Sequence, residues 1–382
     1  MRITKLYKEF FNSEKTSGLI LIVCTILSLT IANSSSGIDY NAFWQTQFAG
    51  HSIVHWINDG LMTIFFLLIG LELEREIYHG ELSNIKDALL PIFAALGGII
   101  IPAGIFMYFN IGTSTQSGAG IPMATDIAFA LGILSLLGNK VPTSLKIFLT
   151  ALAVIDDLGA ILIIATFYTK TIFWVNLLIA LGIFGTLLIL NKLRIKNLII
   201  YIIGGIAMWY FMLNSGVHAT ITGVLLAFAI PYRDGGENSA SYKLQHFLHK
   251  PVAFIILPVF ALANTAIILN SDIGETLSQN YSIGIALGLI VGKPLGIFLL
   301  TFIAVSMGFC KLPDDLSWKS IIGVGFLGGI GFTMSIFITL LAFDNDDIIN
   351  KAKFIILLSS LIAGFIGFIS LKLILNKEYK EE

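Results

Sequence analysis

The chain has 382 residues, of which 56% are hydrophobic and only 12% are charged. Soluble domains carry about 25% charged residues, so the composition excludes an ordinary soluble protein and indicates a polytopic membrane protein. The formal net charge of -1 gives no basic field that would attract nucleic acid, and we expect no such partner. Cys24 and Cys310 lie in separate apolar stretches, which predicts free thiols.

The apolar runs predict an all-α protein with about twelve transmembrane helices. The expected spans cover about residues 17–33, 58–76, 88–109, 121–138, 144–168, 172–191, 197–212, 216–231, 250–270, 282–308, 320–342 and 353–375. Basic residues concentrate in alternate gaps between these spans: Arg75, Lys86, Lys140, Lys146, Lys192, Arg194, Lys196, Arg233, Lys243, Lys250, Lys311 and Lys319. The other gaps hold only Lys170, Lys351 and Lys353. Because cytoplasmic loops carry the excess of basic residues, this bias predicts that both termini are cytoplasmic.

The whole chain, 1–382, is expected to form a single transmembrane domain. Two segments outside the spans have distinct sequence patterns. Residues 1–16 predict an amphipathic cytoplasmic segment. A cleaved signal peptide is the alternative, but Glu9 and Glu14 do not suit one. The outward segment 34–57 contains FWQTQFAGHSIVHW, two short aromatic and β-branched runs around an Ala-Gly pair. This pattern fits a hairpin at the membrane surface or an interfacial aromatic belt.

The fourth and eleventh spans are interrupted by helix-breaking residues. The fourth holds GIPMATDIAFALG, with Pro122 and then a Thr-Asp pair. The eleventh holds GVGFLGGIGFTMSIF, where Gly328, Gly329 and Gly331 favour a broken helix. The two spans should cross in opposite directions, as expected for inverted-topology repeats built from spans three to five and ten to twelve. A glycine-rich helix interface is the alternative for the eleventh span.

Four ionisable residues lie deep in the predicted spans: Asp126, Asp156, Asp157 and Lys293. An aspartate at the bilayer centre costs about 2.5–3.5 kcal/mol, and such residues usually mark ion or proton paths. Successive residues of a helix point about 100° apart, so the two adjacent aspartates cannot meet the same partner. One can pair with Lys293 while the other faces a cavity. The alternatives are an ion pair that only joins helices and a lysine that snorkels to the interface.

A carboxylate in a wet cavity inside the membrane can bind a proton or a small hard cation on the same oxygens. Thr125, Asp126 and the carbonyls of an unwound segment would add oxygen ligands. If the carrier crosses only when loaded with Na⁺ or H⁺, this competition combined with alternating access is antiport. We therefore expect a transporter rather than an enzyme, and no cofactor beyond the transported ions.

Several motifs together resemble the NhaA family of sodium/proton antiporters, over about residues 12–372: ATDIAFALG, ALAVIDDLGAI, GKPLGI, GIGFTMSIF, WINDGLMTIFFLLIGLELERE and SGVHATITG. The resemblance implies twelve helices with inverted repeats, the fourth and eleventh being broken and crossing at mid-membrane. It also implies electrogenic exchange of cytoplasmic Na⁺ or Li⁺ for external H⁺ across the bacterial inner membrane, for sodium transport and pH homeostasis.

The resemblance implies a role for each matching residue. Asp157 would be the principal carboxylate for Na⁺ and H⁺. Asp156 would be the partner of Lys293 and a second carboxylate at the transported Na⁺. Thr125 and Asp126 would lie at the helix crossing, and the outward hairpin would join two copies into a homodimer in the lipid bilayer.

The family also responds to pH, and the matching residues are Glu72, Arg75, Glu76, His246 and His249. An ordinary solvated helix end is the alternative for the first three. Gln245 departs from the family, which has a titratable glutamate there, so the pH profile is left open while exchange is not. Asp59 and His218 match as well. We expect a hydrogen-bonding structural role for Asp59, and helix-end packing or pH sensing for His218.

The nearest rival function is a sodium-coupled symporter of a small organic anion on a related fold. Such symporters generally bind Na⁺ with neutral oxygens, whereas two adjacent carboxylates and a lysine suit proton exchange better. An intramembrane aspartyl protease would need a Gly-x-Gly-Asp motif, which the sequence lacks. A passive cation channel is the third alternative.

Overall fold

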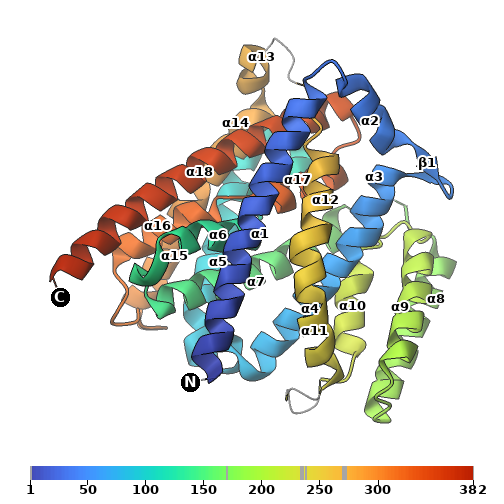
Figure 1. The fold of residues 1–382 in the computed structure, drawn as a ribbon, viewed down its shortest axis with the longest axis horizontal. Helices are drawn as coiled ribbons and strands as arrows, with labels where there is room; N and C mark the ends of the chain where they lie inside the picture. Colours follow the sequence, from blue (N-terminus) through green and yellow to red (C-terminus); the bar gives the residue numbers. More distant parts are fainter. Residues whose placement is uncertain (1, 169–170, 233–235, 237–238, 269–272, 382) are drawn as a thin grey trace. The chain divides into compact units, whose positions relative to one another are not determined.

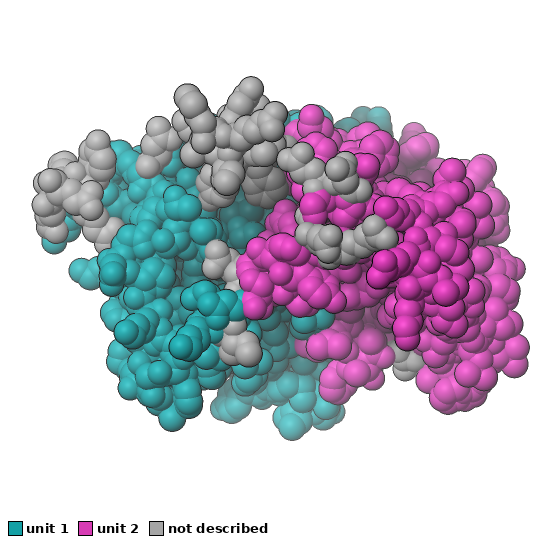
Figure 2. Space-filling view, turned by 90° about the horizontal axis from the view of Figure 1, so that it is seen from below, with its two compact units in different colours: residues 1–38, 84–160, 264–382 teal, residues 39–83, 161–263 magenta. Residues whose placement is uncertain are grey.

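The structure is a computed structural model that describes residues 2–168, 171–232, 236, 239–268 and 273–381. The chain divides into two compact units, shown in different colours in Figure 2. The first comprises residues 1–38, 84–160 and 264–382, and the second comprises residues 39–83 and 161–263. Parts of the sequence predictions that lie outside the described residues are Lys170, Arg233 and residues 269–270.

The first unit is built from helices (Figure 1). They are α1 (Arg2–Ala32), α5 (Ile85–Asn110), the 3-10 segment η3 (Gln116–Met123), α6 (Ile127–Leu136), the 3-10 segment η4 (Gly138–Lys140), α7 (Thr143–Phe167), α13 (Ile273–Ser278), α14 (Asn280–Leu287), the π-helical segment η6 (Gly288–Gly292), α15 (Lys293–Ser306), α16 (Trp318–Gly328), α17 (Phe332–Ala342) and α18 (Asp346–Glu381). The last residues of α7 belong to the second unit.

The second unit adds one short hairpin to its helices (Figure 1). Its elements are α2 (Gly37–Gln45), β1 (Gln47–Phe48), β2 (His51–Ser52), α3 (Ile53–His55), the π-helical segment η1 (Trp56–Leu61), α4 (Met62–His79), the 3-10 segment η2 (Glu81–Ser83), α8 (Trp174–Lys192), α9 (Leu198–Leu213), α10 (Ile221–Ala229), α11 (Ala240–Pro251), the π-helical segment η5 (Val252–Ile256) and α12 (Leu257–Asn264). The first two residues of α2 and the last of α12 belong to the first unit.

Among the described residues, nine helices are long and apolar enough to cross a membrane, or ten if the bent pair α16 and α17 is one span. The seventh and eighth expected spans are shorter helices, because α9 has 16 residues and α10 has 9. The prediction of an all-α polytopic membrane protein is confirmed. The count of twelve spans, the cytoplasmic segment at 1–16 and the orientation of the termini stay predictions.

The fourth expected span is not one continuous α-helix. The 3-10 segment η3 contains Pro122, which lacks an N–H donor. The next residues run extended, with ψ of 147° at Ala124 and 97° at Asp126, before α6 begins. This interruption leaves backbone groups of the segment free to bond other partners.

The eleventh expected span bends by 48° between α16 and α17. Glycine permits close approach here: a Cβ on Gly329 would collide with the carbonyl of Leu289, and one on Gly331 with the hydroxyl of Ser335. The bend occurs where the sequence predicted a break. The crossing of the two interrupted spans at mid-membrane stays a prediction.

The hairpin lies within the predicted outward segment 34–57. Strands β1 and β2 are antiparallel, with Phe48 opposite His51. Ala49 and Gly50 connect them with φ of 49° and 88°, the left-handed values of a type I′ turn. Both aromatic runs are strands only in part, because residues 43–45 belong to α2 and residues 53–55 form α3. The external position of the hairpin and its part in a dimer stay predictions.

Candidate ion-binding site

A buried ion pair joins Lys293 to Asp156 in the first unit. Lys293 begins α15 and has no exposed surface. Its Nζ lies 2.6 Å from Oδ2 of Asp156 and also donates a hydrogen bond to the carbonyl of Met123. Thr125 Oγ1 lies 2.7 Å from the same Oδ2. Oδ1 of Asp156 is buried and has no hydrogen-bond partner among the described residues, so two donors hold one oxygen and the other can accept an ion.

Glycines make room for this lysine. Helices α5 and α15 pack backbone to backbone, since a Cβ on Gly97 would collide with the carbonyl of Gly296 and the reverse also holds. A Cβ on Gly98 would lie 3.4 Å from Nζ of Lys293. The π-helical segment η6 ends directly before the lysine, and such segments are frequent at functional sites. Close helix packing therefore positions the ammonium group beside α7.

Thr125 has two acceptors for one hydroxyl proton. Its Oγ1 lies 2.7 Å from Asp156 Oδ2 and 2.8 Å from the carbonyl of Gly328. Because a hydroxyl group carries a single proton, it donates to one of them at a time. An ionised Asp156 attracts that proton more strongly than a neutral carbonyl does. A proton on Oδ2 would instead be donated to Thr125, whose own proton could then turn to Gly328.

Asp126 connects the first turns of two helices. It is the N-cap of α6, and its Oδ1 accepts a hydrogen bond from Phe129 N at 3.0 Å. Its Oδ2 accepts from Thr333 N at 3.1 Å and from Thr333 Oγ1 at 2.5 Å, in the first turn of α17. Helix N-termini carry partial positive charge, so the carboxylate stabilises both ends. Its own N–H donates to the carbonyl of Ile330 at 2.6 Å.

Asp157 follows Asp156 on α7, and each is 1% exposed. The two side chains leave the helix about 100° apart. In this conformation both carboxylates are shielded from solvent, so burial alone does not distinguish their roles. No cluster of three or more His, Cys, Asp and Glu side chains suited to a metal ion occurs in the described part of the chain. Any cation here would be bound by carboxylate, hydroxyl and carbonyl oxygens.

The family model described as Na⁺/H⁺ antiporter 1 matches residues 8–371. The chain belongs to this antiporter family. A protein of Flavobacterium psychrophilum named Na(+)/H(+) antiporter NhaA is 76% identical over 376 residues, covering 98% of each chain. Proteins of the same name from Cytophaga hutchinsonii and Dechloromonas aromatica are 63% and 61% identical, covering 100% and 96% of this chain and 99% and 96% of their own.

In this member of the antiporter family, the predicted pH-responsive residues lie on α4 and α11 of the second unit. His249 Nδ1 lies 3.9 Å from Glu72 Oε1. Arg75 Nη2 forms an ion pair with Glu76 Oε1 at 2.9 Å. His246 is exposed and stacks on the ring of Tyr242, with centroids 6.3 Å apart. The structure therefore groups four of the five residues into two pairs and leaves His246 at the surface.

Gln245, the departure from the family pattern, is part of this group. It is 8% exposed, and a side-chain hydrogen bond joins it to Glu72. Glu74 was not among the predicted residues; it is 5% exposed and accepts a hydrogen bond from Ser241 Oγ at 3.1 Å. The sequence signal was the second glutamate of GLELERE, which stands between the two that were predicted and lies on the α4 face toward α11. A neutral residue at 245 thus touches the half-buried carboxylate of Glu72, while the buried Glu74 lies two residues further along α4.

Asp59 and His218, which also match the family, each contact a neighbouring group in the second unit. Asp59 Oδ2 lies 3.3 Å from His55 Nε2, and His218 Nε2 lies 3.1 Å from the carbonyl of Tyr168. Near the end of α4, the hydroxyl of Tyr232 lies 3.1 Å from His79 Nδ1. Burial raises the pKa of Tyr232, so its phenol stays protonated and can donate to the imidazole.

Thr333 and the Met123 carbonyl were missed at the central site. Thr333 stands inside the quoted motif GIGFTMSIF, directly after the glycines. A hydroxyl residue in the first turn after a break is suited to bind an acidic side chain from another element. That signal could have found Thr333. No sequence pattern indicates which carbonyl a lysine reaches.

Proposed function

We propose that this chain is an electrogenic antiporter that exchanges cytoplasmic Na⁺, or Li⁺, for external H⁺ by alternating access. Membership of the antiporter family and the names of its relatives support this function. The observation that supports it most directly is the environment of the buried Asp156. Its Oδ2 is held by Lys293 and Thr125, while its Oδ1 accepts no hydrogen bond from the described residues. Such a carboxylate can gain either a proton or a cation.

Competition for the two adjacent carboxylates supplies the coupling. Na⁺ is a hard cation that prefers oxygen ligands, and Asp157, Asp156 Oδ1, Thr125 and the carbonyl of Gly328 are oxygen donors of this region. A proton bound to either carboxylate removes negative charge that the cation needs. Lys293 supplies positive charge to the two carboxylates when no ion is bound. Binding or release of Na⁺ or H⁺ therefore changes the net charge around an ammonium group that stays in place.

Residues of the second unit support pH regulation and a homodimer, and the sequence supports the orientation in the membrane. The pairs Glu72–His249 and Arg75–Glu76 contain ionisable groups on which a change of pH could act. The hairpin residue Phe48 is 69% exposed and suits contact with a second copy in a homodimer. The basic gaps of the sequence favour cytoplasmic termini in the bacterial inner membrane.

Proteoliposomes that contain a pH-sensitive dye test the proposal. A Na⁺ gradient should drive proton movement with no organic substrate present, and a K⁺ gradient should not. Asp157→Asn should abolish the Na⁺-driven signal without lowering the melting temperature, whereas Asp87→Asn, at an exposed carboxylate, should keep it. Sodium movement that requires an organic anion would favour the symporter. Full exchange by the Asp157→Asn protein would refute the assigned site.

A further inference from the structure

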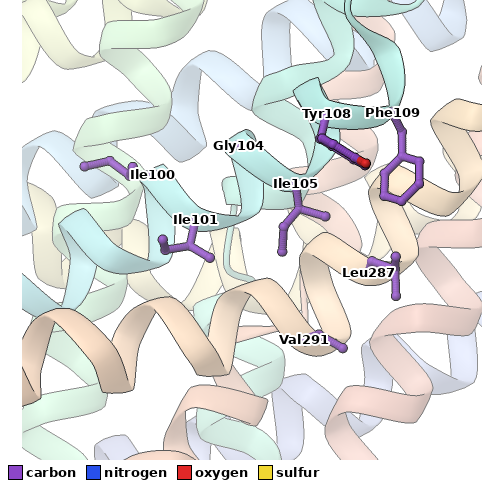
Figure 3. A pocket seen from close by; sticks show the side chains of 8 residues that line it. All are labelled: Ile100, Ile101, Gly104, Ile105, Tyr108, Phe109, Leu287 and Val291. Carbon is purple, nitrogen blue, oxygen red and sulfur yellow. The ribbon is translucent and has the colours of Figure 1, made fainter.

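A surface groove in the first unit lies against the segment that carries Lys293. It has a volume of about 540 Å³ and is formed by α5 on one side and by α14 and η6 on the other. Ile101 and Ile105 point from α5 toward the segment with Leu287 and Val291 (Figure 3). The volume lies within the range of about 300–1,000 Å³ that is usual for ligand clefts.

The groove opens to the outside of the protein within two apolar spans. Ile100, Leu287 and Val291 are 55%, 39% and 47% exposed, and their helices belong to the candidate spans Lys86–Asn110 and Asn280–Ser306. At this depth the surrounding solvent is hydrocarbon. Water would find few polar partners on these walls, and an unfilled groove would lose dispersion contacts.

Gly104 creates the open space on the α5 wall. A Cβ built on this glycine meets nothing within 4 Å. Gly97 and Gly98 on the same helix differ, because their missing side chains let α15 and Lys293 approach. Helix packing therefore explains the absence of a side chain at those two positions and does not explain it at Gly104.

One end of the groove is polar. Tyr108 is 80% exposed and stands two residues before the end of α5, where the polar loop NIGTSTQSGAG begins. Tyrosine is enriched at the membrane interface, where its hydroxyl meets lipid head groups. The stretch from Ile100 to Tyr108 spans about 12 Å of helix. An amphiphile with an apolar tail and a polar end matches this arrangement.

We propose that the groove is a binding site for one acyl chain of a phospholipid, with the ester and head group beside Tyr108. The bound chain packs on Val291 and on Ile105, whose Cδ1 lies 2.9 Å from where a Cβ of Gly292 would be. Gly292 directly precedes Lys293. The lipid tail thus supports the π-helical segment η6 from its membrane side.

Photo-cross-linking of the full-length protein tests the site. The protein is purified in detergent and mixed with a trace of a diacyl phospholipid that carries a diazirine in one acyl chain. Peptides are then mapped by mass spectrometry. We expect the α5 peptide that contains residues 100–109 to be labelled at least fivefold more than peptides of α8, and unlabelled phospholipid to compete for this labelling.

Matched glycine variants distinguish binding of a lipid chain in the groove from nonspecific contact with the surrounding hydrocarbon. Gly104→Phe should fill the groove and reduce labelling of α5 at least fivefold. Gly104→Ala should leave most of it. Gly182→Phe is the control, because Gly182 of α8 is also exposed and its Cβ would also meet nothing within 4 Å. Equal labelling of α5 and α8, no competition, or unchanged labelling of Gly104→Phe would each mean contact with bulk hydrocarbon only and would overturn the proposal. The mapping of the unmodified protein decides even if a variant fails to fold.

Discussion

Removing the charge of Lys293 should destabilise the protein strongly. Lys293→Met keeps most of the side-chain volume but leaves Asp156 without the ammonium group that lies 2.6 Å from its Oδ2. Both side chains of the pair are completely buried, so solvent cannot replace the lost partner. Breaking a buried pair on one side costs about 3–5 kcal/mol.

This cost translates into a measurable melting shift. An unfolding entropy of about 2.1 cal/mol/K per residue gives about 0.8 kcal/mol/K for 382 residues, and hence a drop of about 4–6 °C. Membrane proteins retain more structure on unfolding than soluble ones, which lowers this entropy and enlarges the shift. Thermal melting in detergent, followed by the fluorescence of the five tryptophans, measures it.

A double-mutant cycle isolates the pair itself. Asp156→Leu alone should also lower the melting temperature, because it leaves a buried ammonium group. The combination of Lys293→Met and Asp156→Leu removes both charges and should recover most of the loss, since apolar replacement of a buried pair is often neutral or stabilising. Unchanged melting of Lys293→Met, or a double variant whose losses simply add, would contradict the reasoning.

Three further changes probe other parts of the molecule. Thr333→Val removes the hydroxyl donor to Asp126 and should lower stability by about 1.5–3 kcal/mol, measured by melting, together with Na⁺-driven proton flux. Gln245→Glu places a second carboxylate against Glu72, and two carboxylates in contact retain a shared proton, so the midpoint of the pH–flux profile should move to higher pH by about one unit. Phe48→Asp puts a charge on the exposed hairpin and should shift the molar mass in detergent from dimer toward monomer.

Each of these changes has a matched control. Thr333→Ser keeps the hydroxyl and should retain near-normal melting and flux. Gln245→Asn stays neutral, so its pH–flux midpoint should not move. Ile111→Asp adds a charge at a position that is 70% exposed outside the hairpin, and its molar mass should equal that of the unmodified protein. A control that changes as much as its test variant would remove the specific explanation.

The pairing of Asp156 with Lys293 could be predicted from the sequence because burial of charge is so costly. Asp156 and Lys293 are too deep in apolar runs to lack partners, and the breaks at Pro122 and around Gly329 were visible as residues that interrupt a helix. The identity of the remaining contacts depends on how distant segments meet. The pairing of Thr333 with Asp126 spans 207 residues, and no local pattern encodes it.

In the second unit, the burial of charged residues could not be predicted from the sequence. Glu74 and Arg75 are neighbours in a charged run that resembles a solvated helix end, so the burial of Glu74 could not be read from the run itself. Packing of α4 against α11 decides which charges of the run are covered. Likewise the short helices α9 and α10 have the composition of membrane spans but not their length, because the chain turns earlier than hydropathy indicates.

The bonds around Asp126 have a mechanical consequence. This residue is tied to α17 through Thr333 and to the bend through Ile330, while its neighbour Thr125 reaches Gly328. These hydrogen bonds hold the two interrupted segments together at several points, so we expect the segments to behave as one rigid unit. A carrier built in this way would change access by moving its other helices around this unit. The ion would then stay almost stationary while the barriers on its two sides open and close in turn.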